Sequence, residues 1–245
     1  MARLSVLTPV YHIQESTFAR FIEQMKQISS MIPNMQLVVV VDDDDDDSDT
    51  MRIVEQAKQE NPELDIKLVP HHGNKGIGPA RNTCLDNADG EILWFADYDD
   101  TYHASNVKTL YIAACSKRSQ ECGLIIGRMY VQYSDGTIKA KGGSRNAWRD
   151  YHNQVCSDMK WLKARLAIPG ISRFMIRKSF LDKSGLRFEQ ISPGEDKDFL
   201  YRAVMLEKKA FVIHQVIYTY CYPIDINWNV KWKKQKKEIG KDTFD

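Results

Sequence analysis

Three acidic clusters follow apolar strands or begin a helix. Asp42 and Asp43 directly follow a run of four valines, and Asp97 and Asp99 directly follow the apolar run ILWFA. The carboxyl ends of parallel strands meet at one edge of a sheet, and open α/β folds bind ligands at that edge. Two aspartates that flank one residue offer the hard oxygen ligands that Mg²⁺ and Mn²⁺ prefer. This pattern indicates a metal-bridged diphosphate, and an ordinary aspartate-rich turn is the simpler alternative.

The third cluster, Glu195 and Asp196, follows Pro193 and Gly194 at the first turn of an expected helix. A general base at this place would take a proton from an acceptor hydroxyl. The alternative is that the two carboxylates only interact favourably with the helix dipole. Because a helix N-terminus lowers the pKa of a carboxylate, we expect a catalytic Asp196 to act mainly by its position.

The first acidic cluster belongs to a longer run that places seven aspartates in the eight positions 42–49. The formal net charge of the chain is nevertheless +1, from 34 basic and 33 acidic residues, so nucleic acid is not expected as a partner. Repulsion within the run favours a bound cation, a neighbouring arginine or raised pKa values. A solvated acidic loop is the alternative for the last four members of the unbroken run.

Short apolar runs and helical patterns alternate through the first hundred residues and would position these clusters. The pattern predicts strands at 4–8, 36–41, 66–69 and 91–96, and helices at 15–30, at 50–59 and from Pro79 onward. Strands separated by helices of this length indicate parallel βαβ units with right-handed crossovers.

The second half of the chain has a different pattern of expected strands and helices. It predicts a hairpin of 123–133 with 137–140, a strand at 171–176, an amphipathic helix at 195–207 and one or two strands within 211–222. Neither an internal repeat nor a Gly/Ser linker separates the halves, so we expect them to share one continuous sheet.

The sequence also bears on the compartment. No apolar run approaches the roughly 20 residues that span a bilayer, and the start does not resemble a signal peptide, so a cytoplasmic protein is expected. The five cysteines are odd in number and widely spaced, without a C-x-x-C pair. We interpret them as free thiols, mostly in the core.

Six short motifs, in order and at the usual spacing, resemble glycosyltransferase family 2. They are Pro9-Val10-Tyr11; Val41-Asp42-Asp43; Asn74-Lys75-Gly76 with Ala80-Arg81-Asn82; Asp97-Tyr98-Asp99-Asp100; Gly185-Leu186-Arg187-Phe188; and Gly194-Glu195-Asp196-Lys197-Asp198-Phe199 with Arg202. The resemblance runs from Ser5 to about Tyr222. It implies an α/β fold of the GT-A type, with a Rossmann-like, mostly parallel central sheet flanked by helices and a mixed-sheet acceptor half.

The resemblance divides the chain into a nucleotide-sugar-binding half at 1–100, an acceptor-binding and catalytic half at 101–225, and a basic tail at 226–245. Asp43, or its neighbour Asp42, would accept the imide N–H of uracil. The family usually continues with Gly-Ser-x-Asp where this chain has further aspartates, so the choice between the two stays open. The residues expected to bind the nucleotide are Thr8, Pro9, Tyr11, Asp42, Asp43, Asn74, Arg81 and Asp97.

The family resemblance also implies the reacting groups. Asp97 would face the ribose, Asp99 would hold Mn²⁺ or Mg²⁺, and Asp97 is a second candidate ligand. Asp196 matches the catalytic base, and Glu195 would orient it or touch the acceptor. Arg81 and the metal would neutralise the leaving diphosphate, and displacement on the opposite face would invert the anomeric configuration.

The expected function is that of an inverting, metal-dependent glycosyltransferase of the hexosyltransferase type. It would move a sugar from a nucleotide-sugar, with a UDP-sugar favoured, to a glycan or lipid-linked acceptor in surface polysaccharide or lipopolysaccharide synthesis. The alternatives are a non-catalytic carbohydrate or divalent-cation binding module and a nucleotidyltransferase of related fold. The missing early Gly-rich phosphate loop argues against the nucleotidyltransferase.

Aromatic and basic residues of the second half are candidates for acceptor and membrane contacts. Trp148, Arg149 and Trp161 lie where the family places acceptor contacts, and ordinary packing is the alternative. The tail carries Trp228, Trp232 and six lysines between residues 227 and 241, which predicts peripheral contact with the inner face of an anionic membrane. A solvated terminal helix is the alternative.

Overall fold

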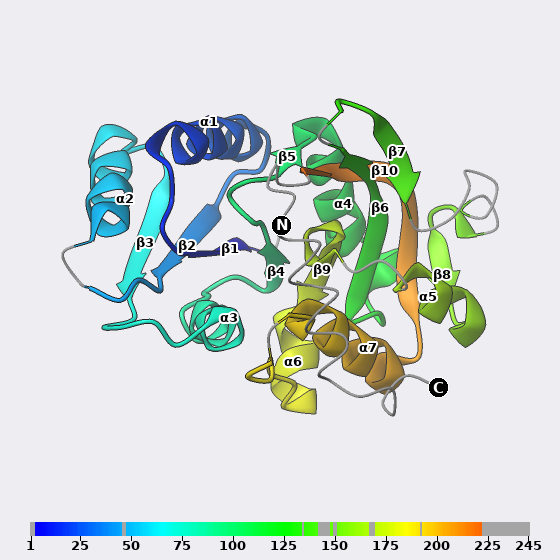
Figure 1. Cartoon of the computed structure of the whole chain (residues 1–245). Helices are drawn as coiled ribbons and strands as arrows, with labels where there is room; N and C mark the ends of the chain where they lie inside the picture. The colour runs from blue at the N-terminus through cyan, green and yellow to red at the C-terminus, as the bar shows by residue number, and fades with distance from the viewer. Residues whose placement is uncertain are drawn as a thin grey trace.

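One continuous sheet connects the two halves of the chain. The computed structural model describes residues 3–45, 48–133, 135–141, 148, 151–166, 170–191 and 193–221. Within these residues, ten strands join in the order β3-β2-β1-β4-β9-β6-β10-β5, while β7 pairs with β6 and β8 pairs with β10. Figure 1 shows the sheet running through both halves, so the prediction of a shared sheet is confirmed.

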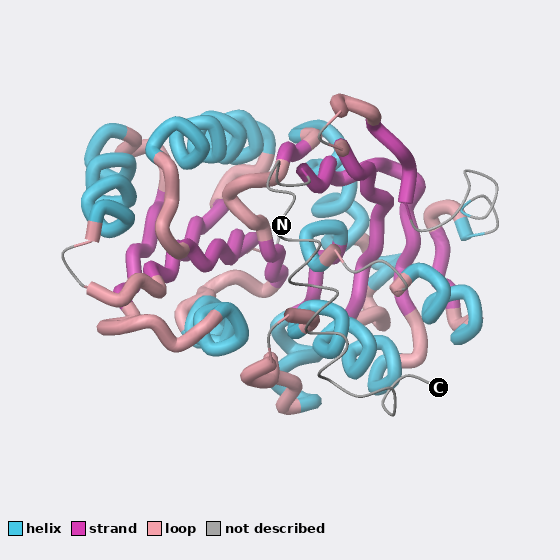
Figure 2. The backbone as a smooth tube through the Cα atoms, viewed as in Figure 1, coloured by secondary structure: helices cyan, strands magenta, loops and turns pink. Residues whose placement is uncertain are grey.

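The first half is built of parallel strands. The strands β1 (Leu4–Val10), β2 (Met35–Val41), β3 (Asp65–Pro70) and β4 (Ile92–Phe95) run in one direction. The helices α1 (Glu15–Met31) and α2 (Asp49–Glu60) cover one face of this part, and α3 (Ile77–Asp86) covers the other (Figure 2). Because both faces are covered, β1 and β2 are buried along their whole length, including the polar residues Ser5, Thr8 and Gln36.

The second half has a mixed sheet. The strand β9 (Phe174–Arg177) lies antiparallel between β4 and β6 (Leu124–Gln132), and β6 runs parallel to β10 (Ala210–Cys221). The predicted hairpin is formed by β6 and β7 (Ile138–Lys141). The remaining elements are β5 (Thr101–Tyr102), β8 (Gln154–Cys156), α4 (Ala104–Cys115), α5 (Met159–Arg165), α6 (Lys178–Ser184), α7 (Glu195–Glu207) and two 3₁₀ turns at 117–119 and 171–173.

Two expectations about these elements are corrected. The helix expected from Pro79 begins at Ile77. Proline is tolerated there because N–H groups of the first turn have no partner inside a helix. The strand expected at 171–176 begins only at Phe174, because residues 171–173 form a turn whose Ser172 carbonyl accepts the indole N–H of Trp94 at 2.7 Å. Helix α4 was not predicted, although its buried positions 107, 110, 111 and 114 have helical spacing.

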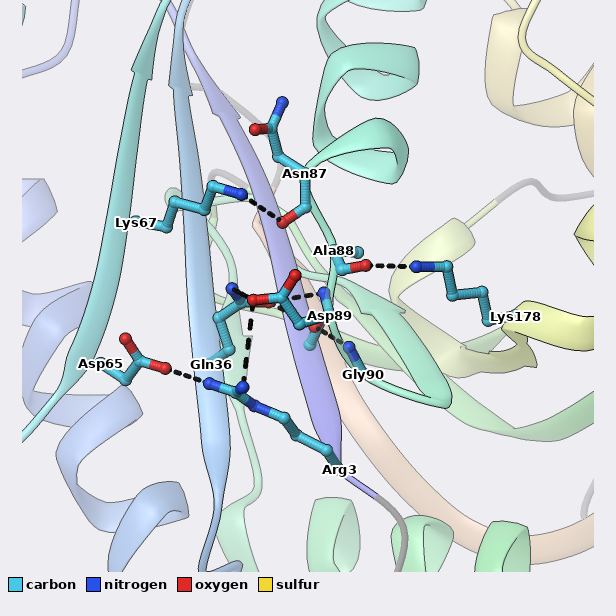
Figure 3. Close-up of polar contacts among 10 residues, drawn as sticks. Arg3, Gln36, Asp65, Lys67, Asn87, Ala88, Asp89, Gly90 and Lys178 are labelled. Carbon is cyan, nitrogen blue, oxygen red and sulfur yellow. Dashed lines mark hydrogen bonds and ion pairs between the residues drawn. The ribbon is translucent and has the colours of Figure 1, made fainter.

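The amino ends of the strands form the edge opposite the acidic clusters. Arg3 pairs with Asp65 and Asp89, and Gln36 donates to Asp89 (Figure 3). Gln36 also accepts the hydroxyl of Ser5. These contacts tie the connection between α3 and β4 to the starts of β1, β2 and β3. A hollow of about 590 Å³ also lies at this edge, and Arg3, Met35 and Asp65 are among the residues that line it.

Two further expectations concern membrane segments and cysteines. None of the helices in the described part of the chain is both long and apolar enough to cross a membrane. All five cysteines are free, and Cys84, Cys122 and Cys156 are buried, as expected.

Candidate active site

The ends of β1, β2 and β4 bring the first two acidic clusters to one edge of the sheet. The Thr8 hydroxyl donates to the carbonyl oxygen of Ala96 at 2.9 Å, and the backbone N–H of His12 donates to Asp43 Oδ1 at 2.9 Å. These bonds join the three strand ends directly. The expectation that parallel strands would deliver both clusters to the same edge is therefore confirmed.

Asp42 holds the loop that follows β3. Its Oδ1 atom is 2.5 Å from His71 Nδ1 and accepts the backbone N–H of Lys75 at 2.9 Å, while its Oδ2 atom accepts the backbone N–H of Gly76 at 2.9 Å. The carboxylate is buried and bonded through both oxygens. In this arrangement Asp42 stabilises the conformation of the loop that follows β3.

Asp43 is bonded differently from its neighbour. It is 3% exposed, and its Oδ2 atom has no hydrogen-bond partner among the described residues. Burial raises the pKa of Asp43, but the hydroxyls of Thr50 and Ser48 and the backbone N–H of His12 outweigh burial and lower it below its usual value. Asp43 is therefore ionised at neutral pH, and its Oδ2 atom can accept a hydrogen bond from a further donor.

Arg81 joins the second acidic cluster to the third. Its guanidinium, in a residue 5% exposed, donates from Nη1 to Glu195 Oε1 at 2.5 Å and from Nη2 to Asp97 Oδ1 at 3.3 Å. Burial would lower the pKa of Arg81, but the charges of Asp97 and Glu195 raise it above its usual value. The guanidinium is therefore a permanent positive charge that links α3 of the first half to α7 of the second.

The segment before α7 is packed directly on α3. Asn82 bonds to Phe188 twice, to its backbone N–H and to its carbonyl oxygen, each at 2.9 Å. A Cβ atom on Gly78 would lie 2.4 Å from the carbonyl oxygen of Glu189, so only glycine allows this approach. The ring of Phe188 also lies 5.6 Å from the guanidinium of Arg81. These contacts set the position of Arg81 relative to the start of α7.

Glu195 and Asp196 have separate environments although they are adjacent. Glu195 Oε2 accepts the backbone N–H of Gly194 at 3.1 Å, so both of its oxygens are engaged. Burial raises the pKa of Asp196 to about 6. The positive charge of Arg81 opposes this rise, and the negative charge of Glu195 adds to it. The expectation that the helix N-terminus would lower this pKa is wrong, because burial outweighs the helix end. A pKa near 6 leaves the carboxylate ionised at neutral pH and able to accept a proton.

This raised pKa predicts how Asp196 affects stability. The pKa of Asp196 is higher in the folded state than in the unfolded state. The contribution of Asp196 to the free energy of unfolding is therefore complete below the unfolded-state pKa and is lost as pH rises through about 6. We expect Asp196→Asn to raise the melting temperature relative to the wild type more at pH 8 than at pH 4.5. Thermal unfolding at the two pH values measures this, and an equal difference at both would contradict the assigned pKa.

The loop after β4 carries the second cluster and is fastened to α1. Arg20 Nη2 donates to the Asp99 carbonyl oxygen at 3.0 Å, and Gln24 Nε2 donates to the Asp100 carbonyl oxygen at 3.3 Å. Burial raises the pKa of Asp99 to about 6, and the charge of Asp97 adds to this rise. Asp100 is buried and its Oδ1 atom accepts the backbone N–H of Cys221 at 3.1 Å. Neither Gln24 nor this role of Asp100 was predicted, because both depend on contacts far apart in sequence.

The remaining nucleotide candidates lie around the same edge. Pro9 is paired with Val40 inside the sheet. Tyr11 is 45% exposed, with its ring 4.0 Å from the ring of His12. Asn74 lies in the loop held by Asp42, and its Oδ1 atom accepts the backbone N–H of Gly76 at 2.9 Å.

The acceptor candidates are packed together. Trp148 is 0% exposed and meets Trp161 edge to face, with ring centroids 5.3 Å apart. The guanidinium of Arg165 lies 4.7 Å from the Trp161 ring. Trp148 has no exposed surface for a sugar in this arrangement, which agrees with the packing alternative. Arg149 and the basic tail lie outside the described residues.

Comparisons with known proteins show the family of the chain. A family model described as Glycosyl transferase family 2 matches residues 5–183. The chain is 25% identical over 223 residues to poly(ribitol-phosphate) beta-N-acetylglucosaminyltransferase TarS of Staphylococcus aureus, which covers 90% of this chain and 35% of TarS. It is 28% identical over 153 residues to succinoglycan biosynthesis protein ExoM of Rhizobium meliloti, covering 60% of this chain and 44% of ExoM. The chain thus spans less than half the length of these relatives.

Solved structures share the fold. Staphylococcus aureus TarS 1–349 in complex with UDP-GlcNAc matches with a TM-score of 0.67 at 20% identity, over 90% of this chain and 59% of that chain. Mannosyltransferase PcManGT of Pyrobaculum calidifontis, in complex with GDP-Man and Mn²⁺, matches with a TM-score of 0.68 at 15% identity, over 94% of this chain and 61% of that chain. With the family model over most of its length, the chain belongs to glycosyl transferase family 2.

Proposed function

We propose that the chain transfers a sugar from a UDP-sugar to a hydroxyl group, with a divalent metal ion and with inversion at the anomeric carbon. One observation carries this proposal: Arg81 connects Asp97 to Glu195, so the candidate metal loop and the candidate base lie around one buried cation. A donor diphosphate and an acceptor hydroxyl would meet between these groups.

Asp43 supports the choice of a uracil nucleotide. An ionised, buried carboxylate with an unused oxygen suits the imide N–H of uracil. Asp42 is already bonded through both oxygens, so Asp43 is the better candidate of the two. The complex of TarS with UDP-GlcNAc is in keeping with this donor, whereas the PcManGT complex holds GDP-Man.

Replacing Asp43 tests this part of the proposal. We expect Asp43→Asn to weaken UDP binding by about 10-fold to 100-fold, because a charge-assisted hydrogen bond is worth roughly 1.5–3 kcal/mol. Isothermal titration with UDP measures the effect. Asp44→Asn is the matched control, because this neighbouring side chain is largely exposed and should change UDP binding less than about twofold. Equal losses in the two variants would contradict the role of Asp43.

Asp97 and Asp99 are suited to hold Mg²⁺ or Mn²⁺. No group of three or more metal-ligating side chains occurs among the described residues. These ions, however, commonly use one or two carboxylates and complete their shell with water and substrate phosphates. Two close carboxylates, one with a raised pKa, form an acidic pair that a cation would stabilise. When bound, the ion would neutralise charge on the leaving diphosphate.

The chain's own residues perform the other steps of the proposed reaction. Asp196 takes the proton of the acceptor hydroxyl, whose oxygen forms a bond to the anomeric carbon while the bond to the diphosphate breaks. Arg81 adds a fixed positive charge near the diphosphate, and Glu195 holds Arg81 in place. Attack opposite the leaving group converts an α-linked donor into a β-linked product.

The acceptor is proposed to be a glycan or a lipid-linked glycan of a surface polysaccharide. The relatives TarS and ExoM, whose names refer to poly(ribitol-phosphate) and succinoglycan, support this class. Contact of the basic tail with a membrane stays a prediction.

A screen of nucleotide-sugars tests the proposed function. We expect UDP release from at least one UDP-sugar in the presence of Mn²⁺, and a loss of at least about 100-fold in Asp99→Ala. A purely binding protein would retain the ligand without releasing UDP. A nucleotidyltransferase would instead consume pyrophosphate and convert the nucleotide-sugar into a nucleoside triphosphate and a sugar 1-phosphate. Unchanged UDP release by Asp99→Ala would contradict the metal assignment.

A further inference from the structure

His71 connects three parts of the candidate donor site, although its position in the sequence suggested no role. Its Nδ1 atom is 2.5 Å from Asp42 Oδ1, and its Nε2 atom is 2.6 Å from Thr83 Oγ1. Its backbone N–H donates to the carbonyl oxygen of Val41 at 2.9 Å. The buried imidazole therefore joins the end of β2, the start of the loop at 71–76, and α3.

The loop at 71–76 needs such support because its backbone is unusual. His72, Gly73 and Gly76 have φ angles of 51°, 105° and 91°, in the region that favours glycine. The consecutive N–H groups of Lys75 and Gly76 both point to the Asp42 carboxylate. The loop shape thus depends on where the oxygens of Asp42 lie, and the Nδ1 atom of His71 bonds to one of them.

The loop leads directly into a helix that carries site residues. Helix α3 begins at Ile77, and Arg81 follows one turn later. His71 also contacts Thr83 in the same helix, so one side chain holds both the loop and the helix that carries Arg81. The side chains of Asn74 and Lys75 are exposed at this edge, and the Oδ1 atom of Asn74 accepts the backbone N–H of Gly76.

We propose that His71 is a positioning residue for donor binding: it orients Asp42, which shapes the loop at 71–76 so that Asn74 and Lys75 contact the donor diphosphate. This role rests on the proposed function, because it assumes that a nucleotide-sugar binds at this edge. His71 itself touches neither the donor nor the reacting atoms.

The chemistry of imidazole suits this position. Neutral His71 with its proton on Nδ1 donates to Asp42 and accepts the Thr83 hydroxyl proton at Nε2. Protonated His71 donates to both, because a hydroxyl oxygen also accepts. In either form, the two ring nitrogens connect Asp42 to Thr83.

Two amide variants separate the two contacts. The side-chain amide of His71→Asn can replace Nδ1 and donate to Asp42, while that of His71→Gln can replace Nε2 and leaves Asp42 without its side-chain partner. We expect His71→Gln to raise the KM for the donor about tenfold with kcat changed less than about threefold. We expect His71→Asn to stay within about threefold of the wild-type KM.

Amide hydrogen exchange in the nucleotide-free protein gives a second readout that needs no donor. Exchange of the Lys75 and Gly76 amides should become about tenfold faster in His71→Gln and stay near wild type in His71→Asn. His103→Gln is the matched control, because His103 Nε2 lies 3.2 Å from Thr219 Oγ1 in a comparable pair between α4 and β10. This variant should leave both the exchange of Lys75 and Gly76 and the donor KM unchanged.

The outcomes distinguish this proposal from the proposed function. Wild-type exchange at Lys75 and Gly76 in His71→Gln would overturn the loop-shaping role. Faster exchange with an unchanged donor KM would overturn the role in donor binding. If the wild-type chain binds no nucleotide-sugar at all, the proposed function fails, and the exchange rates still decide whether His71 shapes the loop.

Discussion

Asp196→Asn is expected to lower the rate of sugar transfer by about 10³-fold while UDP binding stays within about twofold of wild type. The amide keeps the size of the side chain but does not accept the proton of the attacking hydroxyl. The loss should therefore appear in kcat, because the proposed mechanism places Asp196 at the acceptor and assigns the nucleotide to other residues. Initial rates of UDP release together with isothermal titration of UDP measure the two quantities in one preparation.

The same helix supplies the control for this experiment. Asp198 also lies in the first turn of α7, where it pairs with Arg202 at 2.5 Å. Asp198→Asn removes an equal charge from the helix N-terminus and should change kcat less than about threefold. Wild-type activity in Asp196→Asn, or an equal loss in Asp198→Asn, would contradict the assignment of Asp196 as the base.

Arg81→Met is expected to destabilise the fold by roughly 3–5 kcal/mol, because it leaves carboxylates buried without their cation. Glu195 is buried and bonds to Arg81 at 2.5 Å, so it should account for most of this cost. The double variant Arg81→Met with Glu195→Gln removes the uncompensated charge and should recover a large part of the lost stability. Urea unfolding of the two single variants and the double variant forms a complete cycle.

The activity of these variants separates stability from function. The double variant should fold yet remain inactive, because the positive charge near the diphosphate is still missing. A destabilisation of less than about 1 kcal/mol in Arg81→Met would show that the buried pair does not hold the two halves together. Full activity in the folded double variant would remove Arg81 from the proposed site.

The sequence predicted those features of the site that depend on local pattern and on the rules of parallel sheets. Asp43 and Asp97 reach the same edge because each follows a parallel strand. Helix α7 has the predicted bounds, since Gly194, with a φ of 113°, marks its start and its buried residues repeat with helical spacing.

Other features could not be predicted because they depend on partners far apart in the chain. The sequence left Asp42 and Asp43 as equal candidates, and His71, 29 residues after Asp42, separates their roles. The carboxylate of Glu195 meets Arg81 across 114 positions. The pKa of Asp196 was expected to be lowered at the helix end, but burial by distant elements raises it.

The anomeric configuration of the released sugar tests the central claim most directly. With Mn²⁺, an α-linked UDP-sugar that the chain cleaves, and no acceptor, water can replace the acceptor hydroxyl. Proton NMR can then identify the sugar anomer that appears first, before the anomers equilibrate. A single displacement assisted by Asp196 predicts that the β anomer appears first. First appearance of the α anomer would contradict the proposed mechanism.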